Sequence, residues 1–135
     1  MTRFDLSVSD LMSTALITVN RNDPVTGAHA EMQVGVVRHL PVVDERGRLV
    51  GLLSDRDLLG ALGAKPPKKI NDVMTRDIIS VSPESKAHAA AALMLENKIS
   101  SLPVVDEKGT LVGLVTQTDY LELARRALLG LPLER

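Results

Sequence analysis

The 135-residue sequence contains no cysteine and no tryptophan, with Phe4 and Tyr120 as its single phenylalanine and tyrosine. Without cysteine the chain can form no disulfide, no thiolate metal site and no cysteine nucleophile. With so few aromatic side chains it offers no surface on which successive bases could stack, and its core must be aliphatic. These absences are compatible with a reducing cytoplasm.

Charge and hydropathy count against two further classes of partner. The formal net charge is −1, so the chain is not suited to neutralising many phosphates on a duplex. Three lysines between Lys65 and Lys69 lie beside two prolines, a pattern more typical of a solvated linker than of a nucleic-acid site. No apolar run approaches the length of a membrane span. We therefore expect a cytoplasmic protein with neither nucleic acid nor membrane as partner.

The sequence also lacks the patterns of catalytic and metal sites. Its histidines, His29, His39 and His88, do not occur at metal-ligand spacing such as HExxH. No G-x-S-x-G elbow and no P-loop lysine pattern occurs either. We predict a protein that is not an enzyme and binds no metal.

The clearest positive feature is an internal repeat with an offset of 62 residues. Ser9–Val19 reads SDLMSTALITV and aligns with Asn71–Val81, which reads NDVMTRDIISV. His39–Leu59 aligns in the same register with Ser101–Leu121. Of 52 aligned pairs 20 are identical, where about three or four would be expected by chance. The chain is therefore a duplication, with predicted boundaries at 8–62 for repeat 1, 63–69 for a linker and 70–129 for repeat 2.

Each repeat predicts the order strand, helix, strand, strand, helix. The predicted elements are first strands at Leu16–Val19 and Ile78–Val81, first helices at 25–34 and 85–97, hairpins turning at Gly47 and Gly109, and second helices starting at Ser54 and Thr116. One repeat of about 60 residues would be marginally stable alone. We expect the two to form an α/β (α+β) fold around a pseudo-two-fold axis, with a cleft at each strand-to-helix junction.

The pattern G-x-x-[S/T]-x-x-D occurs once in each repeat, at Ser54 with Asp57 and at Thr116 with Asp119. A hydroxyl residue followed three positions later by a carboxylate is a helix capping box. The same atoms suit a ribose 5′-phosphate, because a helix N-terminus attracts phosphate and an Asp accepts hydrogen bonds from a ribose diol. Spacing alone does not decide between the two interpretations.

The duplicated LPVVDE-x-G-x-LVGL motif, with a preceding D-[L/V]-M-[S/T], resembles a tandem pair of cystathionine beta-synthase (CBS) domains, or Bateman module, over positions 8–129. The resemblance implies two β-α-β-β-α repeats and a regulatory ligand such as AMP, ADP, ATP or S-adenosylmethionine, with no cofactor required. It also implies that Ser54 with Asp57, and Thr116 with Asp119, contact phosphate and ribose.

The resemblance implies further ligand contacts just before the Leu-Pro-Val strands, and near the end of the first strand and the start of the first helix. These positions are Val37, Arg38, His39, Ile99, Ser100 and Ser101 for phosphate or base, and Asn20, Val25, Ser82 and Ala87 for the base. Arg56 could add positive charge at the first helix, although Asp55 beside it opposes a polyphosphate. Because Arg38 and His39 align with two serines, we expect unequal sites. The alternative for Arg38 and His39 is a solvated strand edge.

The C-terminal segment YLELARRALLGLPLER carries more apolar residues than one helix face can hold. One stripe contains Leu121, Ala124 and Leu128, and the surplus is Leu123, Ala127, Leu131 and Leu133. A helix apolar on two sides needs a second partner. The resemblance to CBS pairs implies a homodimer formed through the helices, and this tail fits that arrangement. A tail folded back on its own chain is the alternative.

These observations together predict a non-catalytic sensor that binds an adenosine nucleotide and regulates a protein in another chain. The alternative is a structural dimerisation or docking module whose clefts hold no ligand.

Overall fold

A computed structural model of the chain describes residues 5–35, 37 and 39–133. The fold is mixed α/β, as predicted, and divides into two compact units. Unit 1 contains Met1–Leu16, Ile79–Glu107 and Val112–Arg135, and unit 2 contains Ile17–Ile78 and Lys108–Leu111. No helix in the described part of the chain is both long and apolar enough to cross a membrane.

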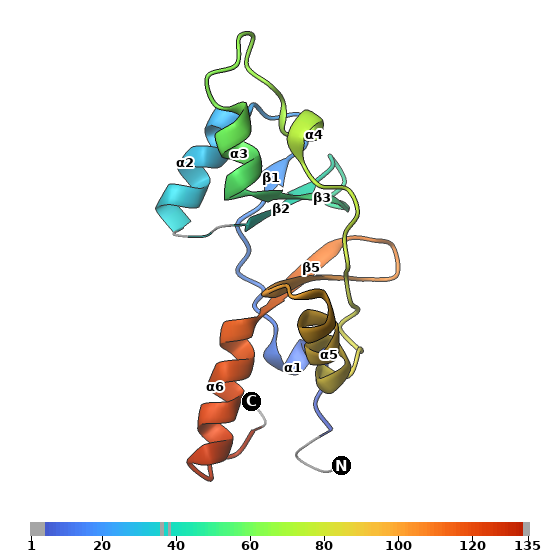
Figure 1. The fold of residues 1–135 in the computed structure, drawn as a ribbon. Helices are drawn as coiled ribbons and strands as arrows, with labels where there is room; N and C mark the ends of the chain where they lie inside the picture. Colours follow the sequence, from blue (N-terminus) through green and yellow to red (C-terminus); the bar gives the residue numbers. More distant parts are fainter. Residues whose placement is uncertain (1–4, 36, 38, 134–135) are drawn as a thin grey trace. The chain divides into compact units, whose positions relative to one another are not determined.

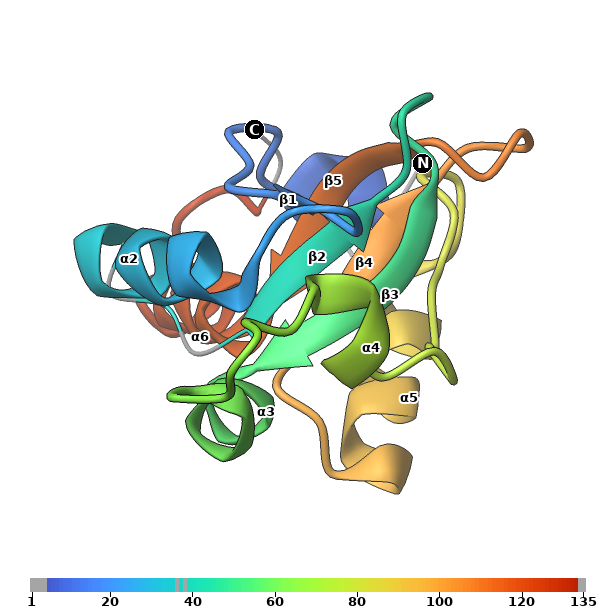
Figure 2. The same cartoon turned by 90° about the horizontal axis from the view of Figure 1, so that it is seen from above.

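Unit 2 contains a three-stranded sheet in the order β1-β2-β3. Its elements are β1 (Val19–Asn20), α2 (Val25–Gly35), β2 (His39–Val43), β3 (Leu49–Ser54), α3 (Asp55–Ala61) and α4 (Ile70–Val73). β1 is parallel to β2, and β2 is antiparallel to β3 with a register shift between Val42 and Val43. Helices α2, α3 and α4 lie on one face of this sheet (Figures 1 and 2). Their apolar sides pack with Leu40, Leu53 and Leu58 to form an aliphatic core.

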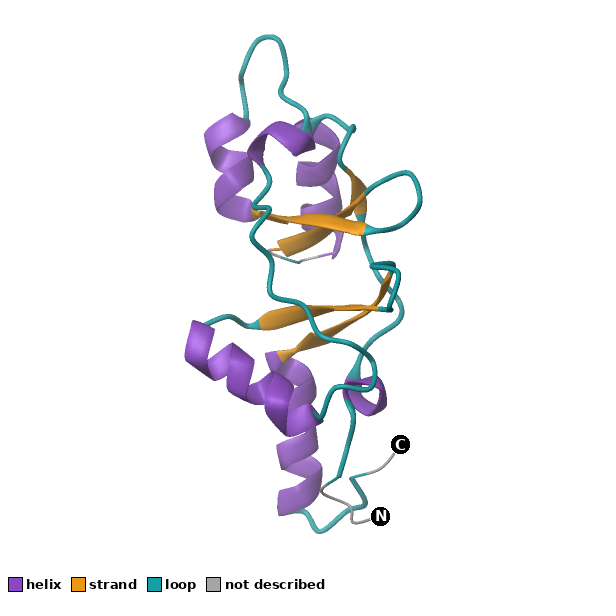
Figure 3. Cartoon of the chain, turned by 90° about the vertical axis from the view of Figure 1, so that its right-hand side faces the viewer, coloured by secondary structure: helices purple, strands orange, loops and turns teal. Residues whose placement is uncertain are grey.

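Unit 1 contains a two-stranded sheet, with its helices again on one face (Figure 3). Its elements are α1 (Val8–Leu11), α5 (Ala87–Asn97), β4 (Ser101–Val105), β5 (Leu111–Thr116, whose first residue belongs to unit 2) and α6 (Gln117–Leu128). Fully buried Leu102, Val104 and Val115 form the centre of its core.

Both predicted hairpins are confirmed, and each turns at a glycine that needs a positive φ. Gly47 has φ +79° and Gly109 has φ +82°, a conformation that a residue with a Cβ rarely adopts. The tips of the two hairpins pair with each other inside unit 2. Leu49 N–H donates to Gly109 O at 3.0 Å, and Leu111 N–H donates to Gly47 O at 3.1 Å.

The predicted first strands were wrong in extent. In place of Leu16–Val19 the strand is Val19–Asn20, and in place of Ile78–Val81 there is one parallel bridge between Val81 and Val104. The reason is that the chain passes from one unit to the other between residues 16 and 17 and between 78 and 79, so the residues next to these crossings are connections. The helix predicted from residue 85 begins at Ala87.

Each repeat contributes its leading segment to the other repeat's core, an exchange that the sequence did not predict. Val8 is fully buried in unit 1, and its N–H donates to Ser85 O at 2.8 Å. The equivalent Ile70 is fully buried in unit 2, and its N–H donates to Asp23 O at 2.9 Å. The two one-turn helices α1 and α4 are these exchanged segments. The compact units therefore differ from the sequence repeats.

The exchanged segments end against the strands that carry the G-x-x-[S/T]-x-x-D pattern. In unit 2 the backbones of Leu52 and Thr75 exchange two hydrogen bonds of 2.9 Å. Next to this pair, Met74 packs directly over Gly51, and a Cβ on Gly51 would lie 3.1 Å from Thr75 O and overlap the Met74 side chain. The glycine of the pattern is thus required for the close approach of the exchanged segment.

Unit 1 repeats this arrangement 62 residues along the chain. Ser13 and Leu114 exchange backbone hydrogen bonds of 2.9 and 3.0 Å, and Met12 covers Gly113. A Cβ on Gly113 would lie 3.3 Å from Ser13 O and 2.5 Å from Met12 Sδ. The same packing constraint therefore acts on both motif strands.

We predict that Gly51→Ala and Gly113→Ala each lower the free energy of unfolding by about 1–3 kcal/mol, because the added methyl overpacks the methionine and the adjacent carbonyl. Urea unfolding followed by circular dichroism measures this change. The matched control is Gly60→Ala, on α3, where an added Cβ meets nothing within 4 Å. That change should stabilise the helix by up to about 1 kcal/mol. Equal effects of Gly51→Ala and Gly60→Ala would contradict the packing argument.

Candidate functional site

In unit 2 the motif forms the junction between β3 and α3. Ser54 is the N-cap of α3, and its Oγ accepts a hydrogen bond from Asp57 N–H at 3.1 Å. Asp57 Oδ2 in turn accepts from Ser54 N–H at 3.0 Å. In the first turn of the helix, Arg56 N–H donates to Asp55 Oδ1 at 2.9 Å. The capping interpretation is therefore confirmed here.

In unit 1 the corresponding junction joins β5 to α6. Thr116 N–H donates to Asp119 Oδ2 at 2.8 Å, and Thr116 Oγ1 lies 3.2 Å from the same oxygen. Asp119 N–H donates to Thr116 Oγ1 at a longer 3.4 Å. Among the described residues, the hydrogen bonds to both motif carboxylates, Asp57 and Asp119, use Oδ2. Each of these two residues is half-buried, and the bond from the cap backbone holds its side chain in a defined orientation.

The residues before β2 were predicted to add positive charge. His39 is exposed at the start of β2, and its register partner on β3 is Ser54. The strand register therefore places His39 directly opposite the cap residue Ser54. Val37 is half-buried and packs against the unit 2 core, and Arg38 lies outside the described residues. Arg56 is exposed on α3.

The equivalent residues before β4 carry no charge. Ile99 and Ser100 are exposed, and Ser101 is half-buried as the first residue of β4. The carbonyl oxygen of Ser100 accepts a hydrogen bond from Gln117 N–H, the first donor of α6, at 2.8 Å. One of the N-terminal donors of α6 is therefore used within the chain.

The residues predicted to contact the base occupy two different environments. Asn20 and Ser82 are half-buried, and both take part in local turns: Asn20 Oδ1 accepts from Asn22 N–H at 2.9 Å, and Ser82 N–H donates to Ser85 Oγ at 3.0 Å. The side chains of Val25 and Ala87 belong to the cores, with exposed fractions of 1% and 6%. Any contact at these two positions must therefore come mainly from the backbone.

Tyr120 was not among the predicted site residues, yet it lies next to Asp119 and contacts α5. Its Oη donates a hydrogen bond to Ala87 O at 2.7 Å. Burial, followed by the nearby charge of Asp119, raises the pKa of Tyr120 above its usual value, so the phenol keeps its proton at neutral pH. The sequence contained one signal for this residue: Tyr120 aligns with Leu58, so one repeat has a hydroxyl where the other has an apolar side chain.

The C-terminal tail folds back along α6, which was the alternative to a surplus face. Gly130 turns the chain with φ +71°, Leu131 N–H donates to Arg126 O, and Arg126 Nε donates to Pro132 O. Leu133 then packs beside the unit 1 core.

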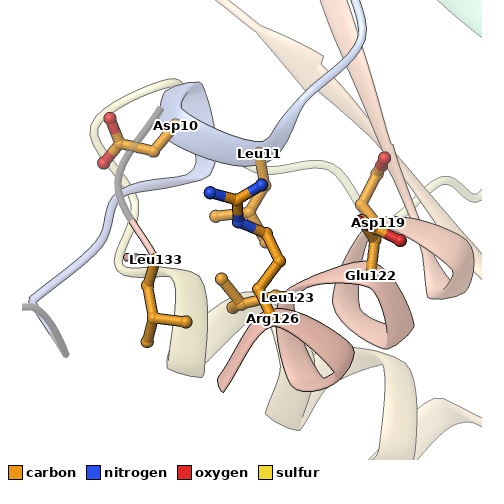
Figure 4. A pocket seen from close by; sticks show the side chains of 7 residues that line it. All are labelled: Asp10, Leu11, Asp119, Glu122, Leu123, Arg126 and Leu133. Atoms are coloured by element: carbon orange, nitrogen blue, oxygen red, sulfur yellow. The ribbon is translucent and has the colours of Figure 1, made fainter. Parts of the chain in front are cut away.

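Between α1, α6 and this tail lies a hollow of about 290 Å³ (Figure 4). It is lined by Asp10, Leu11, Asp119, Glu122, Leu123, Arg126 and Leu133. Asp119 is thus the one predicted site residue that borders it.

The other apolar stripe of α6 is exposed. Leu121 and Leu128 have exposed fractions of 65% and 88%, and Ala124 between them is also exposed. Leu123 instead packs toward the unit 1 core. The assignment of the two sides was therefore reversed: two of the four residues predicted as surplus, Leu123 and Leu133, pack at the unit 1 core, and the predicted stripe of Leu121, Ala124 and Leu128 is the exposed side.

A family model described as the CBS domain matches the chain twice, at residues 8–64 and 70–126. The chain belongs to the CBS domain family. The two matches cover both junctions described above. The family resemblance and the fold predicted from the sequence are therefore confirmed.

The chain spans about a quarter of the length of curated relatives that are enzymes. The homoserine O-acetyltransferase of Methanococcoides burtonii is 37% identical over 117 residues, which are 87% of this chain and 24% of that protein. The similarity is confined to the CBS part of the relative, so it carries no evidence for acetyl transfer by this chain.

Two solved structures match this chain over nearly their whole length. The CBS domain pair of protein MJ0100, in complex with 5′-methylthioadenosine and S-adenosyl-L-methionine, is 32% identical with a TM-score of 0.79, over 91% of this chain and 98% of that one. CBSX2 in complex with AMP is 32% identical with a TM-score of 0.82, over 90% and 98% of the two chains.

Proposed function

We propose that this CBS pair is a non-catalytic regulatory module that binds an adenosine nucleotide, AMP, ADP or ATP, or S-adenosylmethionine. The observation that carries the proposal is the doubled capping junction, at Ser54 with Asp57 and at Thr116 with Asp119, on a fold whose similar structures hold adenosine compounds. The ligand would bind without covalent chemistry, and the regulated protein would be another chain in the cytoplasm.

The capping box supports ligand binding because it pre-orients each carboxylate. Oδ2 of Asp57 and of Asp119 accepts the backbone N–H of its cap residue, which holds the side chain in one position. Oδ1 can then accept hydrogen bonds from both hydroxyls of a ribose without a further loss of side-chain entropy. Capping and ligand binding are thus compatible uses of the same residue.

The phosphate contacts are proposed to be unequal. His39, beside Ser54, and Arg56 can carry positive charge in unit 2. In unit 1 the phosphate would meet the uncharged Ser101 and the N-terminus of the 12-residue α6, where Ser100 O already accepts the first N–H. We therefore propose that unit 2 binds nucleotides with more phosphate groups better than unit 1 does.

We predict that Asp57→Ala and Asp119→Ala each remove one binding event and weaken affinity at their own junction by about tenfold or more, because a charged acceptor of ribose hydroxyls is lost. Isothermal titration calorimetry with AMP, ADP, ATP and S-adenosylmethionine measures the affinities. A melting-temperature series supplies a second measure, since ligand at 100 times its Kd should add about 2.7 kcal/mol of stability.

The matched control for these variants is Ser7→Ala. Ser7 forms the same kind of capping box with Asp10, its N–H donating to Asp10 Oδ2 at 2.9 Å, but it lies outside the repeated motif and does not line the hollow that Asp119 borders. It should cost about the same stability, about 1 kcal/mol, and leave affinity unchanged. Absence of heat and of a melting shift with all four compounds at millimolar concentration would refute the nucleotide proposal.

A second candidate function, homodimerisation through α6, is favoured by the exposed stripe of Leu121, Ala124 and Leu128. In an antiparallel pair of α6 helices, Leu121 of one copy would meet Leu128 of the other, with the small Ala124 near the two-fold axis. This is the self-complementary pattern that an isologous interface requires. The stripe is continuous and apolar, and its burial would remove two large leucines per copy from water.

We predict a dimer by analytical ultracentrifugation at tens of micromolar, and a monomer for Leu128→Glu, because a buried unpaired carboxylate opposes the interface. Leu59→Glu is the matched control. Leu59 aligns with Leu121 in the repeat and is 68% exposed on α3, so its change should leave the dimer intact. A wild-type monomer, or equal dissociation by both variants, would rule out an α6 interface.

A further inference from the structure

Tyr120 connects two parts of the proposed ligand site that are distant in sequence. It follows Asp119 in the first turn of α6, and its hydroxyl reaches Ala87 O, in the first turn of α5. Among the residues that the structure describes, this is the hydrogen bond that joins α5 to α6. The ribose acceptor and the start of the base-contacting helix are therefore held together through one phenol.

We propose that Tyr120 is a positioning residue for ligand binding in unit 1, which sets the start of α5 against the Asp119 carboxylate. This inference rests on the proposed nucleotide function. It adds a residue, outside the repeated motif, on which nucleotide binding would depend. It applies to unit 1 alone, because the repeat provides no equivalent hydroxyl in unit 2.

Packing and hydrogen bonding restrict the position of the Tyr120 side chain. Its ring packs against the unit 1 core, and its hydroxyl is 2.7 Å from the acceptor, the usual distance for an O–H donor to a carbonyl. On the other side, Ala87 is fixed by its own N–H, which donates to Leu6 O at 2.8 Å. The exchanged N-terminal segment, α5 and α6 thus meet at Ala87.

Unit 2 holds its equivalent helices in a different way. The residue aligned with Tyr120 is Leu58, which is 1% exposed and packs in the unit 2 core with Val25, the residue aligned with Ala87. Apolar contact there is non-directional, whereas the Tyr120 hydrogen bond fixes both a distance and an angle. The two junctions therefore have the same capping box but differ in the contact that holds the helix after the cap against the first helix of the repeat.

The test measures each site separately with AMP as the probe. In an Asp57→Ala background, which leaves the unit 1 site, Tyr120→Phe should weaken AMP binding by about three- to tenfold, because the ring stays and one hydrogen bond is lost. In an Asp119→Ala background, which leaves the unit 2 site, Tyr120→Phe should change affinity by less than about twofold. Calorimetry supplies the affinities, and melting curves without ligand check folding.

The matched control is Leu58→Met, a conservative change at the equivalent position of repeat 1, which should leave AMP binding in the Asp57→Ala background unchanged. An equal loss caused by Tyr120→Phe in both backgrounds would indicate a general structural effect and overturn the inference. An affinity unchanged in the Asp57→Ala background would overturn it as well.

A second measurement does not require the Tyr120→Phe variant. Tyr120 is the single tyrosine of the chain, so protein grown with tyrosine 13C-labelled at Cζ gives one tyrosine signal. Saturating AMP should shift this signal in the Asp57→Ala protein, and should leave it in place in the Asp119→Ala protein. No shift in the Asp57→Ala protein, with binding seen by calorimetry, would overturn the inference.

The outcomes separate this inference from the proposed function. If AMP, ADP, ATP and S-adenosylmethionine all fail to bind the unmodified protein, the proposed function is wrong. If the unmodified protein binds AMP but Asp57→Ala abolishes all binding, the function stands and the inference about Tyr120 is overturned, because unit 1 is then not a site.

Discussion

The close approach of a methionine-bearing segment to a motif glycine is the constraint on which both units depend. Met74 over Gly51, and Met12 over Gly113, bring each exchanged segment close enough for its backbone to pair with the strand at Leu52 or Leu114. The paired residue, Leu52 or Leu114, lies two positions before the residue that carries the cap hydroxyl. The strand end that presents Ser54 or Thr116 is therefore held from both sides, by its hairpin partner and by the segment from the other repeat.

This constraint explains why two motifs occur together in each repeat. The D-[L/V]-M-[S/T] segment and the G-x-x-[S/T]-x-x-D pattern are about 40 residues apart in one repeat, yet the contact is made with the partner repeat. Met12 of repeat 1 covers the glycine of repeat 2, and Met74 of repeat 2 covers the glycine of repeat 1. A single repeat would leave its methionine and its strand edge exposed, which is a physical reason for the duplication.

Local patterns in the sequence predicted the hairpins, the first and second helices and the caps at Ser54 and Thr116, because each depends on residues near one another in the chain. The exchange of α1 and α4 could not be predicted in this way, since Val8 and Ile70 bond to Ser85 and Asp23, residues of the other repeat, only after the chain has folded. The predicted bounds of the first strands were wrong for the same reason, because an apolar run determines neither the length of a strand nor the strand with which it pairs.

The candidate site shows a similar division between local and distant information. The motif predicted which carboxylates are oriented, Asp57 and Asp119, because a capping box is local. It did not predict that Val25 and Ala87 would turn their side chains into the cores, which depends on the helix packing. Nor did it predict that Tyr120 would reach Ala87, because 33 residues separate them.

The two junctions share a backbone plan and differ in the side chains around it. In unit 2, His39 lies opposite the cap residue and Leu58 packs the helix against the core. In unit 1, Ser101 stands at the position of His39 and Tyr120 at the position of Leu58. The backbone constraint at Gly51 and Gly113 is common to both, so these neighbouring positions could change without loss of the fold. Under the proposed function, charge near the cap would act on phosphate, whereas a hydrogen bond between helices would act on the geometry of the site. The duplicated module would thus respond to two features of one ligand class with one architecture.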